Sequence, residues 1–303
     1  MTVMTDLQKK LSQQLTGISV LLNEPMSRHT SFRIGGPAEM MIFPKNTEEL
    51  AVALKESALL NIKPAILGAG TNVLAPDAGM SGVVICLKDA LDGMEHTGEN
   101  SIRVMAGVTM TRAAIFAANL GLSGLEFAHG IPGTIGGGVY MNAGAYGGEI
   151  CQVCSKVWVM DFAGNITCKS NAEMGFSYRY SCLEEEQGIV TCCEFSLQKA
   201  PVDEIKAKMQ ELMVKRKTSQ PLEMPSAGSA FKRPVGGYAA ALIDQAGLKG
   251  FRVGDAAISE KHAGFAVNCG NASAEDVKAL LKQVAERVRE NSGIQLEPEV
   301  RIW

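Results

Sequence analysis

The sequence lacks long apolar runs and dense clusters of positive charge. Its apolar runs stay below the ~20 residues that a membrane-spanning helix needs. The first residues, MTVMTDLQKKLSQQLTG, carry Asp6, Lys9 and Lys10 where a signal peptide would have an apolar core. Lysine and arginine are scattered and the net charge is -3, so no nucleic-acid surface is indicated. We expect a cytoplasmic monomer that binds neither nucleic acid nor membranes.

A regular cysteine pattern is also missing. The eight cysteines are irregularly spaced and, without an export signal, indicate reduced thiols. Cys151 and Cys154, followed by the pair Cys192 and Cys193, leave a zinc site open as an alternative. However, the second pair lacks the two-residue gap and no histidine lies near it in sequence. Small buried side chains are the simpler interpretation, and no metal is expected.

The composition is that of a globular protein with several subdomains, because 46% of the 303 residues are hydrophobic and 20% are charged. Residue periodicity predicts two successive α/β units after a short amphipathic helix. Strands are expected at 38–44, 63–70, 82–87 and 101–107, helices at 46–60 (capped by Asn46 or Thr47) and 109–124 (capped by Thr109 or Thr111), and a hairpin over 156–170 that turns at 163–165. The second unit ends near 188–200.

The pattern changes near Pro201, where a domain boundary is expected at 199–202. A helix is predicted over 201–217 and another over 272–290, where Ser273 and Asp276 form a capping box. Their apolar faces are Ile205, Met209, Leu212 and Met213 in the first helix, and Val277, Leu280, Leu281, Val284 and Val288 in the second. The polar segment 218–237 between them is a candidate site loop. The expected organisation is a helix over 1–20, subdomains over about 21–86 and 87–199, and an α+β domain over 200–303.

Two glycine clusters are candidates for holding a nucleotide. ILGAGTNV imitates G-x-G-x-x-G, but Val73 stands in place of the third glycine and no helix follows, so a Rossmann site is not supported. The stretch 129–149 holds eight glycines, yet no lysine occurs between Lys88 and Lys156, which excludes a Walker loop. Bare backbone N–H groups of two such loops can cradle a diphosphate. The alternative is that these glycines only form tight turns.

Ordered motifs along nearly the whole chain resemble one family. They are HTSFRIGGPA, ILGAGTNVL, GLEFAHGIPGTIGGGVYMNAGAYGGE, FSYRYS, PSAGSAFKRP, SEKHAGFAVN and LEPEVRI. The chain resembles UDP-N-acetylenolpyruvoylglucosamine reductases in these motifs. This resemblance implies an α+β fold in which two α/β subdomains, 21–199, form an FAD-binding fold like that of p-cresol methylhydroxylase and vanillyl alcohol oxidase, and 200–303 binds substrate.

The resemblance also implies non-covalent FAD, NADPH as co-substrate, and reduction of enolpyruvyl-UDP-N-acetylglucosamine in peptidoglycan precursor synthesis. It assigns the FAD contacts to two loops, with Arg33, Ile34 and Gly35 supporting the first. The loop residues are Gly68, Ala69, Gly70, Thr71 and Asn72, then Pro132, Gly133, Gly137, Gly138, Asn142 and Ala143, with Arg301 added from the C-terminal end.

The chemistry makes two demands on catalytic residues. Hydride addition to the terminal alkene carbon leaves negative charge on the adjacent carbon and its carboxylate, which needs electrostatic stabilisation and a proton donor. The resemblance assigns the carboxylate to Arg179 and Glu299, and the proton to Ser229. Glu299 is preferred over Glu297 because it directly precedes Val-Arg. Facing another carboxylate, Glu299 is expected to be neutral and to donate a hydrogen bond.

The UDP part of the substrate needs cations and polar contacts. Candidates are Tyr178, Lys217, Lys232, Arg233, Tyr238, Arg252 and His262. Many family members have asparagine where this chain has Arg233. The segment between Arg179 and Cys192 is too short for the tyrosine-bearing loop of one family branch, so the chain resembles the shorter, second type.

Two other functions stay open from the sequence. One is an oxidase of the same flavin fold that uses dioxygen, with flavin tethered through His129 or a cysteine. The other is a non-catalytic module that binds a nucleotide sugar and regulates a partner. The joint presence of Arg179, Ser229 and Glu299 argues against such a module.

Overall fold

The computed structural model describes residues 5–303, so the first four residues of the helix expected over 1–20 lie outside the described part. The chain divides into two compact units. Unit 1 comprises 1–22, 39–69 and 82–215, and unit 2 comprises 23–38, 70–81 and 216–303. None of the helices within 5–303 combines the length and apolar character needed to cross a bilayer. The division describes how the chain packs, and the assignment of 21–199 to FAD and 200–303 to substrate stays a prediction.

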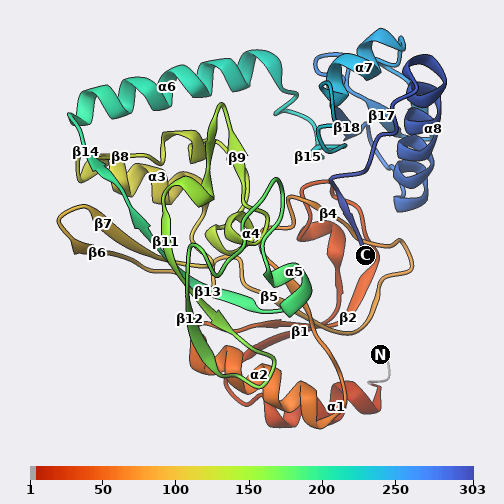
Figure 1. Cartoon of the computed structure of the whole chain (residues 1–303). Coiled ribbons are helices and arrows are strands. Elements are labelled where there is room, and N and C mark those ends of the chain that lie inside the picture. The colour runs from red at the N-terminus through yellow and green to blue at the C-terminus, as the bar shows by residue number, and fades with distance from the viewer. Residues whose placement is uncertain (1–4) are drawn as a thin grey trace. The chain divides into compact units, whose positions relative to one another are not determined.

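The N-terminal part of unit 1 is a four-stranded sheet with two helices. Its elements are α1 (Asp6–Gln14), β1 (Ser19–Pro25), β2 (Pro37–Phe43), α2 (Thr47–Leu59), β3 (Ala65–Leu67) and β5 (Met80–Cys86), with strand order β1-β2-β5-β3. Helices α1 and α2 lie side by side (Figure 1). Asn46 caps α2 by accepting from Glu49 N–H, which decides between the two expected caps. Leu11 and Leu54 belong to the same apolar core as Met40 of β2.

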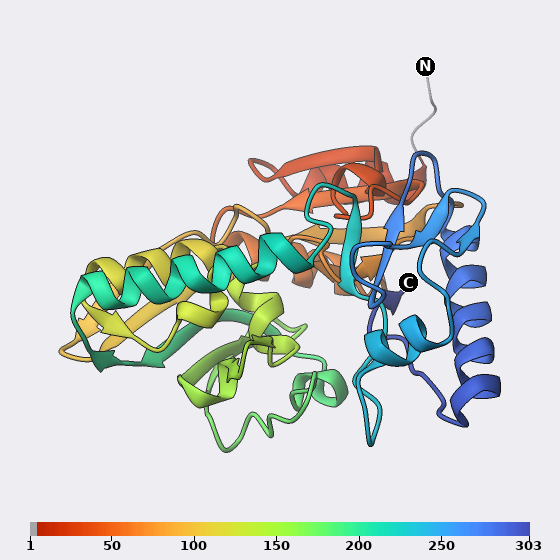
Figure 2. The ribbon, with the colours of Figure 1, turned by 90° about the horizontal axis from the view of Figure 1, so that it is seen from above.

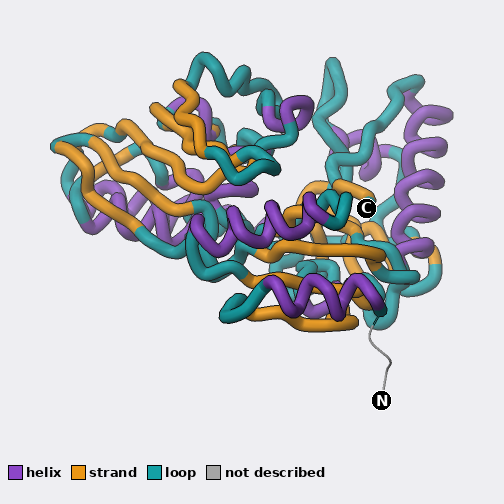
Figure 3. Tube along the Cα trace, turned by 90° about the horizontal axis from the view of Figure 1, so that it is seen from below, coloured by secondary structure: helices purple, strands orange, loops and turns teal. Residues whose placement is uncertain are grey.

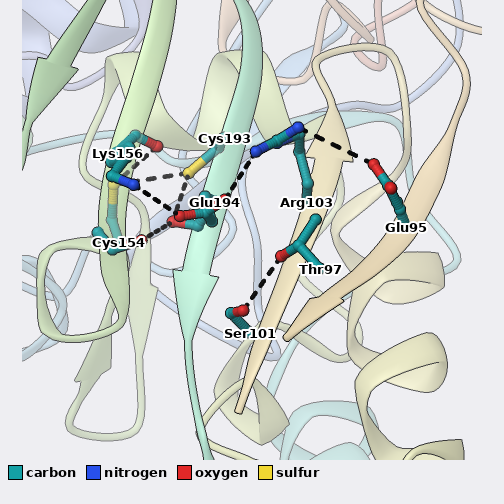
Figure 4. A network of polar contacts seen from close by, with 9 residues as sticks. Glu95, Thr97, Ser101, Arg103, Cys154, Lys156, Cys193 and Glu194 are labelled. Atoms are coloured by element: carbon teal, nitrogen blue, oxygen red, sulfur yellow. Dashed lines mark hydrogen bonds and ion pairs between the residues drawn. The ribbon is translucent and has the colours of Figure 1, made fainter. Parts of the chain in front are cut away.

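The second part of unit 1 is a five-stranded antiparallel sheet of order β12-β11-β13-β7-β6. Its strands are β6 (Met94–Gly98), β7 (Ser101–Met105), β11 (Cys154–Met160), β12 (Ile166–Ser170) and β13 (Ile189–Ser196). The expected hairpin is confirmed, because Met160 pairs with Ile166 and Gly164 has a φ of 84° in the turn. On one face, Glu194 lies 3.0 Å from Arg103 and 3.4 Å from Lys156 (Figure 4).

Helices cover this second sheet. Helix α4 (Ile135–Tyr140) packs on β13, and α3 (Met110–Asn119) begins at the cap Thr109, one of the two caps expected. Helix α6 (Val202–Ser219) runs alongside α3 (Figures 1 and 2). Ile205, Met209 and Leu212 of its expected apolar face are buried, whereas Met213 is only partly buried. Unit 1 is completed by short elements: β8 (Leu122–Ser123), η2 (Glu126–Ala128), β9 (Gly144–Ala145), β10 (Gly148–Glu149), η3 (Ile150–Gln152), α5 (Leu183–Glu186) and β14 (Gln198–Lys199).

Two of the cysteines face each other between β11 and β13. The sulfur atoms of Cys154 and Cys193 lie 3.5 Å apart in the interior (Figure 4). Burial raises the pKa of the Cys193 thiol, as expected for a thiol held in its neutral form. Among residues 5–303 no group of three or more His, Cys, Asp or Glu side chains could hold a metal ion.

Unit 2 has its own sheet and core. The sheet order is β15-β18-β17-β16, formed by β15 (Ser226–Ser229), β16 (Arg252–Val253), β17 (Ala256–Ile258) and β18 (Phe265–Asn268). Helix α7 (Ala239–Gln245) and the long α8 (Ala274–Ser292, Figure 3) accompany this sheet, and α8 packs on β16 and β17. The capping box of Ser273 and Asp276 and the buried apolar stripe of α8 are confirmed.

Segments from the N-terminal third complete unit 2. They contain η1 (Met26–Arg28) and β4 (Val73–Leu74), which pairs in parallel with β19 (Arg301–Ile302). Phe32, Ile34 and Leu74 are buried in the same core as α8. Asp77 accepts from the N–H groups of Ala274 and Glu275 at 2.8 and 3.2 Å, so it stabilises the first turn of α8.

Candidate active site

The glycine-rich stretch 129–149 forms α4 and the turns around it in unit 1. Two of its glycines are required by packing. A Cβ atom at Gly136 would lie 3.0 Å from the Ala106 side chain, and one at Gly138 would lie 2.7 Å from the Met110 sulfur. The N–H groups of Gly136 and Gly138 donate to the carbonyls of Ala106 and Thr134. These contacts fix α4 closely on the unit 1 core.

Other groups of the stretch are positioned differently. Thr134 caps α4, and a Cβ at Gly68 would lie 2.9 Å from the Thr134 hydroxyl, so the two expected cofactor loops meet here. A Cβ at Gly137 would have only this hydroxyl within 4 Å, at 3.8 Å. The buried Nδ1 atom of His129 has no hydrogen-bond partner among the described residues. Bare backbone groups and an unpartnered ring nitrogen within the same stretch are compatible with a polar cofactor such as FAD.

Arg179 lies in a tight turn of unit 1. The backbones of Ser177 and Tyr180 pair through two hydrogen bonds of 3.2 Å, and Arg179 between them has a φ of 56°. This left-handed conformation is usual for glycine and strained for arginine. The Arg179 guanidinium donates to the Gly144 carbonyl at 3.3 Å and lies 5.0 Å from the centre of the Tyr178 ring. The tight turn, the hydrogen bond to Gly144 and the contact with Tyr178 fix the position of the Arg179 guanidinium.

Asn142 joins the glycine-rich stretch to the Arg179 turn. This buried residue has a φ of 42°, and its amide donates to the Ser177 carbonyl at 2.9 Å and to Glu149 at 3.0 Å. Its side-chain oxygen accepts from Cys151 N–H at 2.9 Å. Both donors of the side chain are therefore used within the protein, so any cofactor group that needs a donor from Asn142 must meet its backbone. Its side chain aligns Arg179 with the glycine-rich stretch.

The residues expected to support the first cofactor loop lie in unit 2. Arg33 has a φ of 57°, and the Thr30 hydroxyl donates to the Ile34 carbonyl at 2.9 Å. A Cβ at Gly35 would lie 2.6 Å from the Ala75 side chain, and one at Gly70 would lie 2.0 Å from the His29 carbonyl oxygen. Both positions therefore require glycine, and the backbone of this loop is rigidly packed.

Ser229 and Glu299 are brought together in unit 2 by backbone pairing. Ser229 is the last residue of β15, and the next residue, Ala230, accepts at its carbonyl from Glu299 N–H at 2.9 Å. The Asn72 amide donates to the Glu299 carbonyl at 3.1 Å, and the Asn72 carbonyl accepts from Arg301 N–H at 2.9 Å. One cofactor-loop residue, Asn72, thus sets the backbone on which Glu299 stands.

The surroundings of the two glutamates differ. Glu297 is exposed and pairs with Lys232 at 3.5 Å, whereas Glu299 is partly buried. Gly228, directly before Ser229, has a φ of 75°, and a Cβ atom there would have no other atom within 4 Å. Ser229 itself is exposed. Ser229 and Glu299 thus stand near each other along the backbone, and their joint action on a ligand stays a prediction.

The expected substrate contacts occupy several places in unit 2, apart from Tyr178 of unit 1. The Arg233 guanidinium lies 4.7 Å from the centre of the exposed Tyr238 ring. Lys217 lies near the end of α6, where its carbonyl accepts from the Lys261 ammonium at 2.8 Å. Burial lowers the pKa of His262 below its ordinary value. Arg252 pairs with Asp255 at 3.2 Å.

Sequence reasoning missed Thr134, which caps α4 and contacts the Gly68 position. The sequence carried a signal for this role, because a threonine directly before the first residue of a helix is a typical N-cap. The catalytic candidates themselves are divided between the units, with Arg179 in unit 1 and Ser229 and Glu299 in unit 2.

Comparison with known proteins identifies the family. The family model of the UDP-N-acetylenolpyruvoylglucosamine reductase C-terminal domain matches residues 220–303, and that of the FAD binding domain matches 38–168. The reductase of Caldanaerobacter subterraneus subsp. tengcongensis is 47% identical over 97% of this chain and 96% of its own. That of Lactococcus lactis subsp. cremoris is 43% identical over 96% of each chain.

This chain belongs to the UDP-N-acetylenolpyruvoylglucosamine reductase family. The crystal structure of the Thermus caldophilus reductase superimposes with a TM-score of 0.79 at 36% identity, covering 94% of this chain and 98% of that one. The expected α+β fold with an FAD-binding part is confirmed. The protein is an FAD-dependent oxidoreductase, and its family acts in peptidoglycan synthesis.

Proposed function

We propose that the protein catalyses the NADPH-dependent reduction of enolpyruvyl-UDP-N-acetylglucosamine to UDP-N-acetylmuramate. The observation that carries this proposal is that Ser229 and Glu299 lie on neighbouring backbone segments. Glu299 N–H donates at 2.9 Å to the carbonyl of Ala230, the residue after Ser229. A proton donor and a carboxylate-binding group on neighbouring backbone segments suit a reaction at the carbon next to a carboxylate. We also propose that the protein acts in the cytoplasm as a monomer.

FAD is proposed to bind non-covalently at the two glycine loops, and it supplies hydride transfer between the nicotinamide and the terminal enolpyruvyl carbon. On the protein side, Thr134 and Gly137 present the bare backbone of α4, and Gly70 keeps the first loop close to the chain at His29. The unpartnered Nδ1 of His129 is a further polar contact for this cofactor. These groups hold the cofactor in place without a lysine.

Arg179 and Glu299 are proposed to bind the substrate carboxylate. Charge grows on this carboxylate as the adjacent carbon becomes a carbanion, and a preorganised guanidinium stabilises that growing charge more than it stabilises the ground state. The strained turn and the Gly144 contact keep Arg179 preorganised. Glu299 is proposed to act on the same carboxylate together with Arg179.

Ser229 is proposed to protonate the carbanion. The Oγ–H bond breaks, its proton forms the new C–H bond on the carbon next to the carboxylate, and the alkoxide then regains a proton from water. An alcohol is a weak acid, so this step requires a strongly basic carbanion and a site from which bulk water is excluded. Lys217, Lys232, Arg233, Tyr238 and Tyr178 are proposed to bind the UDP part of the substrate.

An anaerobic two-step flavin assay tests this function. We expect the FAD-loaded protein to be yellow, NADPH to bleach the flavin, and enolpyruvyl-UDP-N-acetylglucosamine to restore the colour without dioxygen. Restoration by dioxygen but not by this substrate would favour the oxidase, and flavin that stays with acid-precipitated protein would indicate a covalent tether. A protein that binds the nucleotide sugar but never consumes NADPH would be a non-catalytic module.

A further inference from the structure

The turn between β17 and β18 in unit 2 carries His262, one of the expected substrate contacts, whose Nδ1 atom is engaged within the turn. The turn begins at Ser259, whose buried hydroxyl accepts from Lys261 and His262 N–H at 3.2 and 3.3 Å. It closes where Ser259 N–H donates to the Phe265 carbonyl and Phe265 N–H donates to the His262 carbonyl, at 2.9 and 3.0 Å. The backbone of the turn is therefore held at both ends.

The imidazole of His262 folds back onto this turn. Its Nδ1 accepts from Gly264 N–H at 3.1 Å, and its ring meets the Phe265 ring edge-on at a centroid distance of 5.0 Å. A Cβ at Gly264 would lie 3.0 Å from the imidazole and 3.2 Å from the Ala240 side chain, so a larger residue there would have to displace the ring. With Nδ1 as acceptor, the ring is neutral and carries its proton on Nε2.

A chain of backbone hydrogen bonds connects His262 with both catalytic residues of unit 2. The Gly264 carbonyl accepts from Ala230 N–H at 2.8 Å, and Ser229 pairs with Phe265 across β15 and β18. The Ala230 carbonyl in turn accepts from Glu299 N–H at 2.9 Å. Gly264 is thus bonded to His262 through its N–H and to the Ser229–Ala230 backbone through its carbonyl.

The charges around the ring favour its neutral form. Burial is the main reason for the lowered pKa of His262, and positive Lys249, which pairs with Asp244 at 2.8 Å, lowers it further. Lys261 on the same turn pairs with Glu223 at 3.8 Å and with the Lys217 carbonyl, and Glu260 packs against Gly250. Lys232, two residues after Ala230, pairs with Glu297.

We propose that neutral His262 is a positioning residue that holds Ser229 and Glu299 in their reactive arrangement through Gly264 and Ala230. This inference rests on the proposed function of Ser229 and Glu299. When the pH falls through the pKa of His262, which lies below the ordinary value of about 6.5, Nδ1 becomes a donor and cannot accept from Gly264. The unfolded chain takes up this proton first, so the turn loses stability as the pH falls.

Two substitutions at His262 separate the effect of losing the hydrogen-bond acceptor from the effect of protonating the ring. His262→Asn keeps an acceptor at the position of Nδ1 that can receive Gly264 N–H, but it does not titrate. His262→Leu removes the acceptor. The measurement is the anaerobic rate at which enolpyruvyl-UDP-N-acetylglucosamine reoxidises the NADPH-reduced enzyme, between about pH 5 and pH 8. Flavin reduction by NADPH, followed in the same samples, is the control and should be equal in all three proteins.

At about pH 7.5 we expect His262→Leu to reoxidise about tenfold more slowly than the unmodified protein, and His262→Asn to recover most of that loss. The ratio of the unmodified rate to the His262→Asn rate should stay constant near neutral pH and fall below the pKa of His262. A ratio that is constant over the whole range, or a leucine variant with the unmodified rate, would overturn the proposal.

A second measurement separates this inference from the proposed reaction. Amide hydrogen exchange at Ala230 and Gly264 should accelerate as the pH falls through the pKa of His262, relative to the His262→Asn variant at the same pH. If this acceleration occurs while the substrate never reoxidises the flavin, the coupling holds and the proposed reaction is wrong. If exchange in the two proteins is the same at every pH, the coupling itself is wrong.

Discussion

Glycines in the stretch 129–149 of unit 1 and in the segment 218–237 of unit 2 are needed for different reasons. In unit 1, Gly136, Gly138 and Gly148 stand where a Cβ would approach neighbouring atoms to 3.0 Å or less. In unit 2, Gly228 and Gly236 have positive φ values and open space where a Cβ would be. These three glycines of unit 1 stand in tight packing, whereas the conformation, and not the packing, demands glycine at Gly228 and Gly236.

The catalytic candidates differ in the same way. Arg179 is held by side-chain contacts, through its own bond to Gly144 and through Asn142 to Ser177. Ser229 and Glu299 are held by backbone bonds to Ala230 and its neighbours. We therefore propose that the glycine-rich stretch of unit 1 contributes to cofactor binding through its packing, and that proton delivery depends on backbone alignment in unit 2.

The largest effect is expected for Arg179→Gly. Removing the guanidinium should lower the rate of flavin reoxidation by substrate on the order of 10³-fold. Glycine accepts the φ of 56° without strain, so the free energy of unfolding should rise by about 1 kcal/mol. Stopped-flow absorbance and urea unfolding of the FAD-loaded protein measure the two effects.

Gln187→Gly is the matched control for Arg179→Gly. Gln187 has a φ of 59° at the end of α5, its side chain accepts from Lys63, and neither residue is given a role in the reaction. It should gain stability like Arg179→Gly, with both flavin half-reactions unchanged. If Arg179→Gly destabilised the protein while Gln187→Gly stabilised it, the contacts of Arg179 would outweigh its strain, contrary to this account.

A smaller effect is expected for Gly148→Ala in the packed segment. The new Cβ would lie 2.5 Å from the Phe127 ring, so the ring must shift, and unfolding should become easier by about 2 kcal/mol. The protein should also retain less FAD after gel filtration, which flavin absorbance measures. Full FAD retention with unchanged stability would show that the stretch is not a tightly packed platform.

The smallest effect on stability is expected for Gly228→Ala in the open turn. No atom obstructs the new Cβ, and only the φ of 75° is unfavourable, so the loss should be about 1 kcal/mol. FAD content and reduction by NADPH should be normal, while reoxidation by substrate slows because Ser229 shifts. Loss of FAD equal to that of Gly148→Ala would remove the distinction between the two segments.

Local features were well predicted from the sequence. The caps Asn46 and Thr109, the capping box of Ser273 and Asp276, and the hairpin turn at Gly164 all depend on residues a few positions apart. The choice of Glu299 over Glu297 rested on motif position, and the structure adds a physical difference, because Glu297 is exposed and paired with Lys232. Such features follow from short-range chemistry that the sequence displays directly.

Long-range features were not predictable in the same way. Segments 23–38 and 70–81 pack with the C-terminal part, joined by contacts such as Asp77 to Ala274 and Asn72 to Glu299. Each contact spans about two hundred residues or more, so no periodicity or spacing reports it. The alignment of Ser229 through Gly264 and His262 likewise depends on strand register, which is set by the folded sheet.

The most direct test of the account is the Ser229→Ala variant in the anaerobic two-step flavin assay. The account predicts that NADPH reduces its flavin at the unmodified rate, because the Ser229 hydroxyl is not among the groups proposed to hold FAD. Reoxidation by enolpyruvyl-UDP-N-acetylglucosamine should fall on the order of 10²-fold, because the proton donor in unit 2 is gone. Equal slowing of both steps, or reoxidation at the unmodified rate, would contradict the assignment of proton delivery to Ser229.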